Sequence, residues 1–177
     1  MTGHRLPDVL DTDLNVIFIG TAAGKKSAET GHYYAGPGNR FWPTLHEVGL
    51  TPRCFRPEEF RELLGLRMGL TDLSKLGAGM DHDIRPEEFD FAHFKANLAH
   101  FRPRAIAFTS KKAAALALGE DSTHDVAYGR RAQRDGLPEI FVLTSPSGAA
   151  RSHWDIAPWL ELAHWLAATR EEKHDAR

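Results

Sequence analysis

Three short apolar segments, rich in β-branched and aromatic residues, predict the central strands of the fold. They read NVIFIG at residues 15–20, AIAFT at residues 105–109 and IFVLT at residues 140–144, and turn or polar residues bound each of them. Segments without polar alternation are typical of strands that are buried on both faces, as in a parallel sheet. A further segment, MGLTDL at residues 68–73, adds either a fourth strand or a loop across the end of the sheet.

Apolar residues at helical spacing predict helices between and after these strands. The candidate helices span residues 57–66, 86–101, 111–118 and 156–169. In the second of them, large apolar residues recur on one face from Phe91 to Phe101, and Pro86 suits the first turn. Strands that alternate with helices predict an open α/β sheet with helices on both faces and with functional loops at the carboxyl ends of the strands.

Length and composition favour one globular domain that spans residues 1–177. Of the 177 residues 42% are hydrophobic, which is enough for one core, and no repeat or linker divides them. We expect residues 1–13 and 171–177 to form frayed tails. The single cysteine, Cys54, excludes an intrachain disulfide and suits a reducing compartment. The sequence shows no signal peptide and no apolar run of about 18 residues, so we expect a cytoplasmic protein without a membrane span. We also expect a monomer.

Small and polar residues follow each of the three apolar strands. The loops read GTAAGKKSA from Gly20, SKK from Ser110 and SPSGAARSH from Ser145. Ligands of open α/β sheets bind at this edge, where the carboxyl ends of the strands meet. In the first loop, a glycine backbone with Lys25 and Lys26 fits an anion or a nucleobase carbonyl, and a simple tight turn is the alternative.

The run GHYYAGPGNRFW at residues 31–42 is the most distinctive part of the chain. It combines glycines, a proline, aromatic rings and one asparagine, a composition for a shaped loop that presents flat faces and an amide. Stacking on an aromatic ring together with amide hydrogen bonds is how proteins hold a nucleobase that has left its helix. Core packing is the favoured interpretation for Phe41 and Trp42, but not for Tyr34 and Asn39.

Two segments carry a resemblance to a known family. The stretch IFIGTAAGKKSAETGHYYAGPGNRFWPTLHEVGL resembles the first motif region of the mismatch-specific uracil and thymine DNA glycosylases, a branch of the uracil DNA glycosylase superfamily. VLTSPSGAAR is similar to the second motif, a loop that presses into the minor groove while the base is flipped, and GLTDL and AFTSKKAA lie between in family order. The resemblance implies a three-layer α/β/α sandwich with a central four-stranded, mostly parallel sheet. It also implies monofunctional hydrolysis that releases a deaminated base, with uracil the first choice, and no metal or organic cofactor.

The resemblance also assigns contacts with the flipped base and with the DNA. Tyr34 matches the aromatic residue that stacks on the base, and Ala149 stands where the family inserts a wedge. Because a small side chain is a weak wedge, we expect excision to be easier from single strands or from weakly paired bases. The predicted base contacts are Thr21, Ala22, Ala23, Tyr34, Thr109 and Ser145. The predicted DNA contacts are Lys25, Lys26, Arg40, Lys111, Ser147, Gly148, Ala149 and Arg151.

The sequence departs from the family at the residue that usually positions the hydrolytic water. The mismatch-specific enzymes read Gly-x-Asn-Pro-Gly in the first motif, whereas this chain has Ala22 in place of the asparagine and Ala23 in place of the proline. Asn39 is the first candidate for the missing role, because an amide can accept from a water and donate to a base carbonyl at once. The alternative is that Asn39 only caps the helix that begins near Phe41.

Two further residues are candidates for the chemistry. Asp72 could polarise water or stabilise the oxocarbenium-like charge that develops as the glycosidic bond breaks, although helix capping is the favoured alternative. His153 could donate a hydrogen bond to the oxygen of the departing uracil. The alternative is that one of the ten histidines of the chain lies beside the second motif by chance.

Net charge and the altered motif keep other functions open. A formal net charge of −2 requires a local basic patch for any contact with DNA, and an ordinary solvated surface is the alternative for each lysine. The substitution at Ala22 also fits a catalytically impaired protein that binds uracil or abasic sites. A third possibility is a small-molecule transferase that holds phosphate in the first glycine-rich turn. The chain lacks the glycine spacings of nucleotide-binding motifs, which counts against this possibility.

Overall fold

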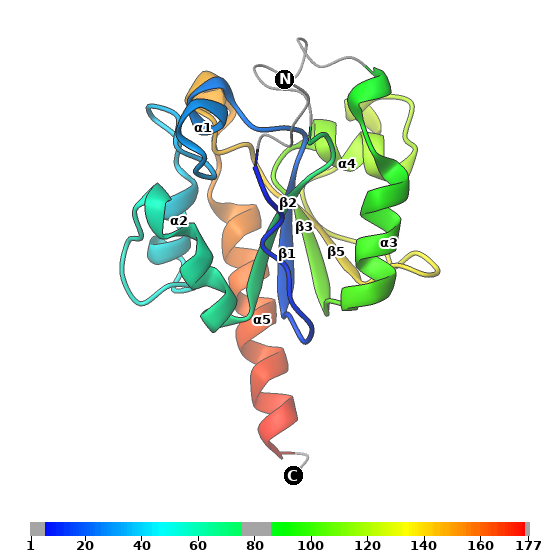
Figure 1. Cartoon of the computed structure of the whole chain (residues 1–177). Helices are drawn as coiled ribbons and strands as arrows, with labels where there is room; N and C mark the ends of the chain where they lie inside the picture. Colours follow the sequence, from blue (N-terminus) through cyan, green and yellow to red (C-terminus); the bar gives the residue numbers. More distant parts are fainter. Residues whose placement is uncertain (1–5, 76–85, 176–177) are drawn as a thin grey trace.

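A central sheet of five strands organises the fold in the computed structural model, which describes residues 6–75 and 86–175 (Figure 1). Its order is β2-β1-β3-β5-β4. The strands are β1 Val16–Gly20, β2 Met68–Asp72, β3 Ala105–Phe108, β4 Gly129–Arg131 and β5 Glu139–Val142. The first four in this order are parallel, and β4 pairs antiparallel with β5. The predicted mostly parallel α/β sheet is confirmed.

The expected number of strands was wrong by one. The additional strand, β4, has the sequence Gly-Arg-Arg and lies at the edge of the sheet. It carries no apolar run because Arg130 is exposed and Arg131 is only half-buried, so hydrophobic patterning could not predict it. The segment at residues 68–73, which was left open between strand and loop, forms β2 and pairs with β1.

The helices follow most of the predicted segments. The α-helices are α1 Lys25–Thr30, α2 Phe41–Glu47, α3 Phe91–Phe101, α4 Lys111–Leu118 and α5 Ala157–Asp175. Residues 57–66 form a 3₁₀ helix, η1 Pro57–Leu66, and the expected helix over residues 86–101 divides into η3 Pro86–Glu88 and α3. The division falls at Asp90, whose side chain accepts the His93 N–H and so starts α3 with an ordinary N-cap. Two further 3₁₀ segments are η4 Thr123–Asp125 and η5 Gly148–His153.

Helices cover both faces of the sheet, as Figure 1 shows. On one face, α2 and α5 pack Phe41 and Trp159 against Phe18 of β1, with ring centroids 5.3 Å and 6.2 Å away. On the other face, Phe94 of α3 packs against Phe108 of β3 at 6.3 Å. Every residue of β1 and β3 is buried, which explains why these strands are apolar without alternation.

The expectation of frayed tails is wrong for residues 6–13 and 171–175, and its remainder, at residues 1–5 and 176–177, lies outside the described residues. Val9 exchanges two backbone hydrogen bonds with Leu70, both 2.9 Å, at the edge of β2, and Leu6 is buried. At the other end, residues 171–175 continue α5. None of the helices in residues 6–75 and 86–175 combines the length and apolarity that a bilayer crossing requires.

Candidate active site

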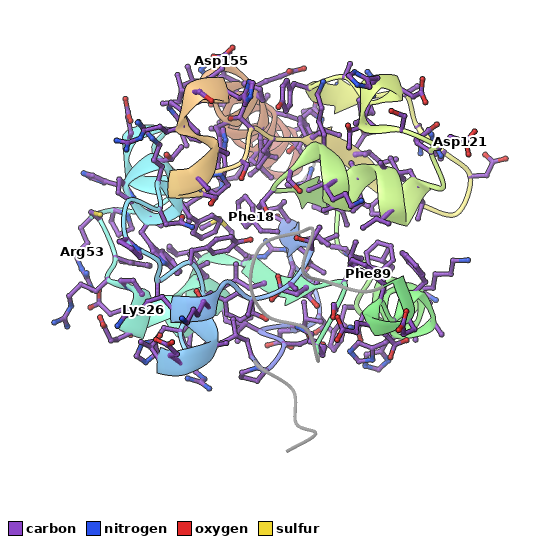
Figure 2. All side chains as sticks on the ribbon, turned by 90° about the horizontal axis from the view of Figure 1, so that it is seen from above. Phe18, Lys26, Arg53, Phe89, Asp121 and Asp155 are labelled. Carbon is purple, nitrogen blue, oxygen red and sulfur yellow. The ribbon has the colours of Figure 1, made fainter. Side chains whose placement is uncertain are left out.

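A cavity of about 880 Å³ opens at the carboxyl ends of the parallel strands. Figure 2 looks down on this end of the molecule, with Phe18 of β1 near the middle and Lys26 of α1 to one side. The loops that follow β1, β3 and β5 contribute to its lining, and β2 contributes its last residue, Asp72, as is usual for open α/β sheets. The lining residues include Gly20–Ser27, Tyr33, Tyr34, Asn39, Asp72, Thr109, Ser110, Ser145–Ala150 and His153.

Three polar side chains converge on the backbone of Gly20 at the floor of the cavity. A methyl group placed on Gly20 would lie 2.5 Å from Asp72 Oδ1, 3.5 Å from the Tyr34 hydroxyl and 3.6 Å from Thr109 Oγ1. Gly20 and Asp72 are paired residues of neighbouring strands, and the Thr109 N–H donates to the carbonyl of Ile19 at 3.0 Å. The parallel register therefore brings the last residues of β1 and β2 and the first residue after β3 to one point.

Asp72 is a buried carboxylic acid at this point. Its side chain is 7% exposed, and it ends β2 rather than beginning a helix, since residues 73–75 are not helical. The helix-capping interpretation of Asp72 is therefore wrong. Burial raises the pKa of Asp72 to about 6, with the positive charge of Lys75 opposing this shift and the negative charge of Asp8 adding to it. Such an acid is mostly ionised at neutral pH, and it can take up a proton within about one pH unit of neutrality.

Tyr34 forms one wall of the cavity. Its ring stacks on Phe41 with centroids 3.9 Å apart and an interplanar angle of 15°, and its hydroxyl lies 3.2 Å from Thr109 Oγ1. Burial raises the pKa of the phenol, which stays neutral. The backbone of Tyr34 has a φ of 54°, a left-handed conformation that bulky residues adopt only where the surroundings hold it. Phe41 and Trp42 lie in the core, as the sequence favoured.

Asn39 lines the cavity and also begins the helix behind it. Its Oδ1 accepts the N–H of Phe41, the first residue of α2, at 2.9 Å. The bond required by the capping alternative is therefore present. The amide nitrogen is the end of the side chain that this bond leaves for another acceptor.

The two motif loops are packed against each other beside the cavity. The Arg40 N–H donates to the carbonyl of Pro146 at 2.8 Å. A methyl group on Gly148 would lie 2.7 Å from the carbonyl oxygen of Pro37, so only glycine fits this approach. The Ser147 hydroxyl accepts the Ala149 N–H at 3.3 Å and starts η5, which ends at His153. The glycine-rich loop and the Ser-Pro-Ser-Gly loop thus form one continuous rim.

A family comparison accounts for this arrangement. The model of the Uracil DNA glycosylase superfamily matches residues 7–168. The chain belongs to this superfamily. It is also similar to a solved structure, the solution NMR structure of a "putative Uracil DNA glycosylase" from Methanosarcina acetivorans. The two chains are 26% identical, the match covers 96% of this chain and 97% of that one, and the TM-score is 0.58.

Members of the uracil DNA glycosylase superfamily act on DNA, and the cavity gathers most of the residues expected to contact it. All six predicted base contacts and all three predicted catalytic residues line the cavity. Of the predicted DNA contacts, Lys25, Lys26, Ser147, Gly148 and Ala149 line it as well. The other three, Arg40, Lys111 and Arg151, are not in its lining.

The three outlying basic residues differ in their surroundings. The Arg40 guanidinium lies 5.3 Å from the ring centroid of Trp154, and Lys111 Nζ lies 4.5 Å from that of Tyr128. Arg151 is exposed on η5. These three residues therefore stay predicted DNA contacts that lie outside the cavity lining.

Sequence reasoning missed the contribution of the N-terminal segment to this superfamily site. Leu6 lines the cavity, and Asp8 contacts a buried lysine, Lys75, close to Asp72. Residues 1–13 are polar for most of their length, which predicted a frayed tail. The signal that could have found the segment is the spacing of Leu6, Val9 and Leu10, three apolar residues in an otherwise polar stretch.

Proposed function

We propose that the chain is a monofunctional DNA glycosylase that flips a deaminated base, uracil first, out of DNA and hydrolyses its N-glycosidic bond. The observation that carries this proposal is the buried Asp72 carboxylate at the floor of an open cavity, beside the aromatic wall of Tyr34. The superfamily match supports the reaction class. The choice of uracil is supported by the resemblance of the motifs to the mismatch-specific branch.

In this proposal the cavity holds the flipped base by one face and one edge. The ring of Tyr34 has Phe41 against one face, and a base would stack on its other side. The backbone of Thr21, Ala22 and Ala23, which lines the cavity, would face the oxygens of the base. The amide nitrogen of Asn39 would donate to a base carbonyl, because its Oδ1 already accepts from Phe41.

Asp72 takes the role that Ala22 cannot fill. As a carboxylate it accepts a hydrogen bond from a water, turns the oxygen of that water toward C1′ of the deoxyribose and stabilises the positive charge that develops on the sugar. The new C1′–O bond forms as the C1′–N bond breaks, and the electron pair of the broken bond leaves with the base. The water gives up one proton to Asp72. Backbone N–H groups of residues 21–23, with His153 at the rim, would stabilise the anionic base until it is protonated.

An excision assay tests this proposal. The purified chain is incubated, in EDTA and in single turnover, with end-labelled oligonucleotides that carry one uracil, one hypoxanthine or the undamaged base, and alkali then cleaves any abasic site. We expect uracil-dependent cleavage in single strands and in duplexes with a mismatch, with the single strand cut faster because the wedge position holds only Ala149. Cleavage of hypoxanthine alone would correct the choice of base.

The second candidate function is binding to damaged DNA without excision, which the loss of the usual asparagine at Ala22 favours. A binding protein would give a uracil-dependent gel shift and leave the oligonucleotide resistant to alkali. The buried acid beside Gly20 counts against it, because burying a carboxylate is costly and a protein that only binds has no need of one. No feature of the cavity favours the small-molecule transferase.

A further inference from the structure

A buried ion pair lies next to Asp72, outside the cavity lining. Lys75 follows Asp72 by three residues, is 4% exposed, and has its ammonium group in contact with the carboxylate of Asp8. Lys75 Nζ also donates to the Tyr33 hydroxyl at 3.2 Å, and that hydroxyl donates to the carbonyl of Pro7 at 2.9 Å. Neither Lys75 nor Asp8 lines the cavity, so neither touches a base bound there.

Asp8 is held as an ionised group by donors from three directions. Thr71 Oγ1 of β2 donates to it at 2.5 Å, and from α3 His93 Nε2 lies at 2.8 Å and Asn97 Nδ2 at 3.2 Å. Burial alone would raise the pKa of Asp8, but Lys75 and the hydrogen bonds with Thr71 and His93 together hold it below its ordinary value. Asp8 thus bonds to Thr71 and to Lys75, which lie on either side of Asp72 in the sequence, so the ion pair sits directly beside the end of β2.

The charges that face Asp72 can be identified. Lys75 acts on it with the larger effect and favours the carboxylate, and Asp8 acts in the opposite sense. Burial, and after it the negative charge of Asp72, raises the pKa of both the Tyr33 and Tyr34 phenols, which stay neutral. The remaining titratable groups of the cavity are Lys25, Lys26, Glu29 and His153, which stand on its exposed rim. Among these groups Lys75 is the buried cation.

We propose that Lys75 is a positioning residue, held in place by Asp8 and Tyr33, whose positive charge stabilises the Asp72 carboxylate from behind the cavity. The pair would do so without contact with the DNA, and the N-terminal segment that supplies Asp8 would thereby be part of the site. This inference rests on the role proposed for Asp72, but its primary readout does not depend on activity.

The primary test is a titration of the Asp72 carboxyl carbon by NMR in the wild type, Lys75→Met and Lys75→Arg, with Asp72→Asn to assign the signal. We expect the midpoint to rise by at least one pH unit in Lys75→Met and to stay within about 0.3 units in Lys75→Arg. A folded Lys75→Met protein with the wild-type midpoint would overturn the proposal.

Lys75→Met leaves Asp8 without its cation and risks the fold, so the double variant Asp8→Asn/Lys75→Met provides a second test. It removes both charges, and because the effect of Lys75 on Asp72 is the larger of the two, we still expect an upward shift. An unchanged or lower midpoint in the double variant contradicts the proposal.

The pH profile of single-turnover excision separates this inference from the proposed function. If both hold, the acid limb of the profile moves upward with the NMR midpoint in Lys75→Met and returns in Lys75→Arg. A shifted NMR midpoint with an unmoved acid limb sustains the electrostatic role of Lys75 and refutes the role of Asp72 in excision. A purely structural role of Lys75 would lower excision equally at every pH and leave both midpoints in place, which contradicts the inference.

Discussion

At the scale of single residues, Gly20 decides whether the acid can reach the floor of the cavity. A methyl group there would lie 2.5 Å from Asp72 Oδ1, so Gly20→Ala must displace the carboxylate. A displacement of about 1 Å can cost about 100-fold in rate, and we expect a loss of that size in single-turnover excision. Gly65→Ala is the matched control, because its new methyl group meets no atom within 4 Å. Equal rates in the two variants would show that Asp72 needs no fixed position.

Asp72 also carries a cost in stability that can be measured. Its pKa is about 6 in the folded protein against an ordinary value of 3.8, so its contribution to stability is present below pH 3.8 and is lost as the pH rises through 6. We therefore expect the advantage of Asp72→Asn over the wild type to grow by about 2.5 kcal/mol between pH 4 and pH 8. Urea denaturation at the two pH values measures this change, and a pH-independent difference would contradict it.

Residue chemistry was predicted from the sequence more successfully than residue partners. Tyr34, Asn39 and Asp72 were selected because an aromatic face, an amide and a carboxylate suit base excision, and all three line the cavity. Their partners depend on contacts between distant parts of the chain. Asp72 looked like a helix cap because residues 69–73 do not reveal that Gly20 lies opposite it in the sheet.

At the scale of elements, the contact between the two motif loops sets the shape of the rim. Gly148→Ala places a methyl group 2.7 Å from the Pro37 carbonyl oxygen, which is backbone and cannot turn aside. Overpacking of this kind costs about 1–3 kcal/mol, and we expect a loss of that size in the free energy of unfolding by urea denaturation. The same measurement on Gly65→Ala should show a change below about 1 kcal/mol. Full stability of Gly148→Ala would mean that the loops separate freely.

The elements that the sequence predicted are those with a buried apolar side. Strands β1, β3 and β5 and helix α4 are bounded as expected to within two residues, because burial on the sheet imposes their patterns. Strand β4 and the 3₁₀ form of η1 could not be predicted in this way. Strand β4 is a polar edge held by backbone bonds to β5, and η1 shows an apolar pattern that does not distinguish a 3₁₀ helix from an α-helix.

At the scale of the whole molecule, a formal net charge of −2 leaves attraction to DNA to local groups. Lys26, exposed at the cavity, is expected to contact a phosphate, whereas Lys95 is exposed on α3 and is not in the cavity lining. Lys26→Ala should weaken DNA binding several-fold for every sequence and lower the salt dependence of the affinity by about one phosphate contact. Lys95→Ala, which removes the same charge, should leave both unchanged in fluorescence anisotropy titrations. Equal effects would indicate attraction by overall charge alone.

Release of the free base is the most direct test of the proposed function, and Asp72→Asn is the variant to compare with the wild type. Both proteins are incubated with a uracil-containing single strand, and free uracil is measured by liquid chromatography and mass spectrometry, with DNA binding measured in parallel. We predict one uracil released per oligonucleotide by the wild type and a rate at least about 100-fold lower for Asp72→Asn, with unchanged binding. Release at the wild-type rate by Asp72→Asn would remove Asp72 from the mechanism, and binding without release by the wild type would contradict a glycosylase.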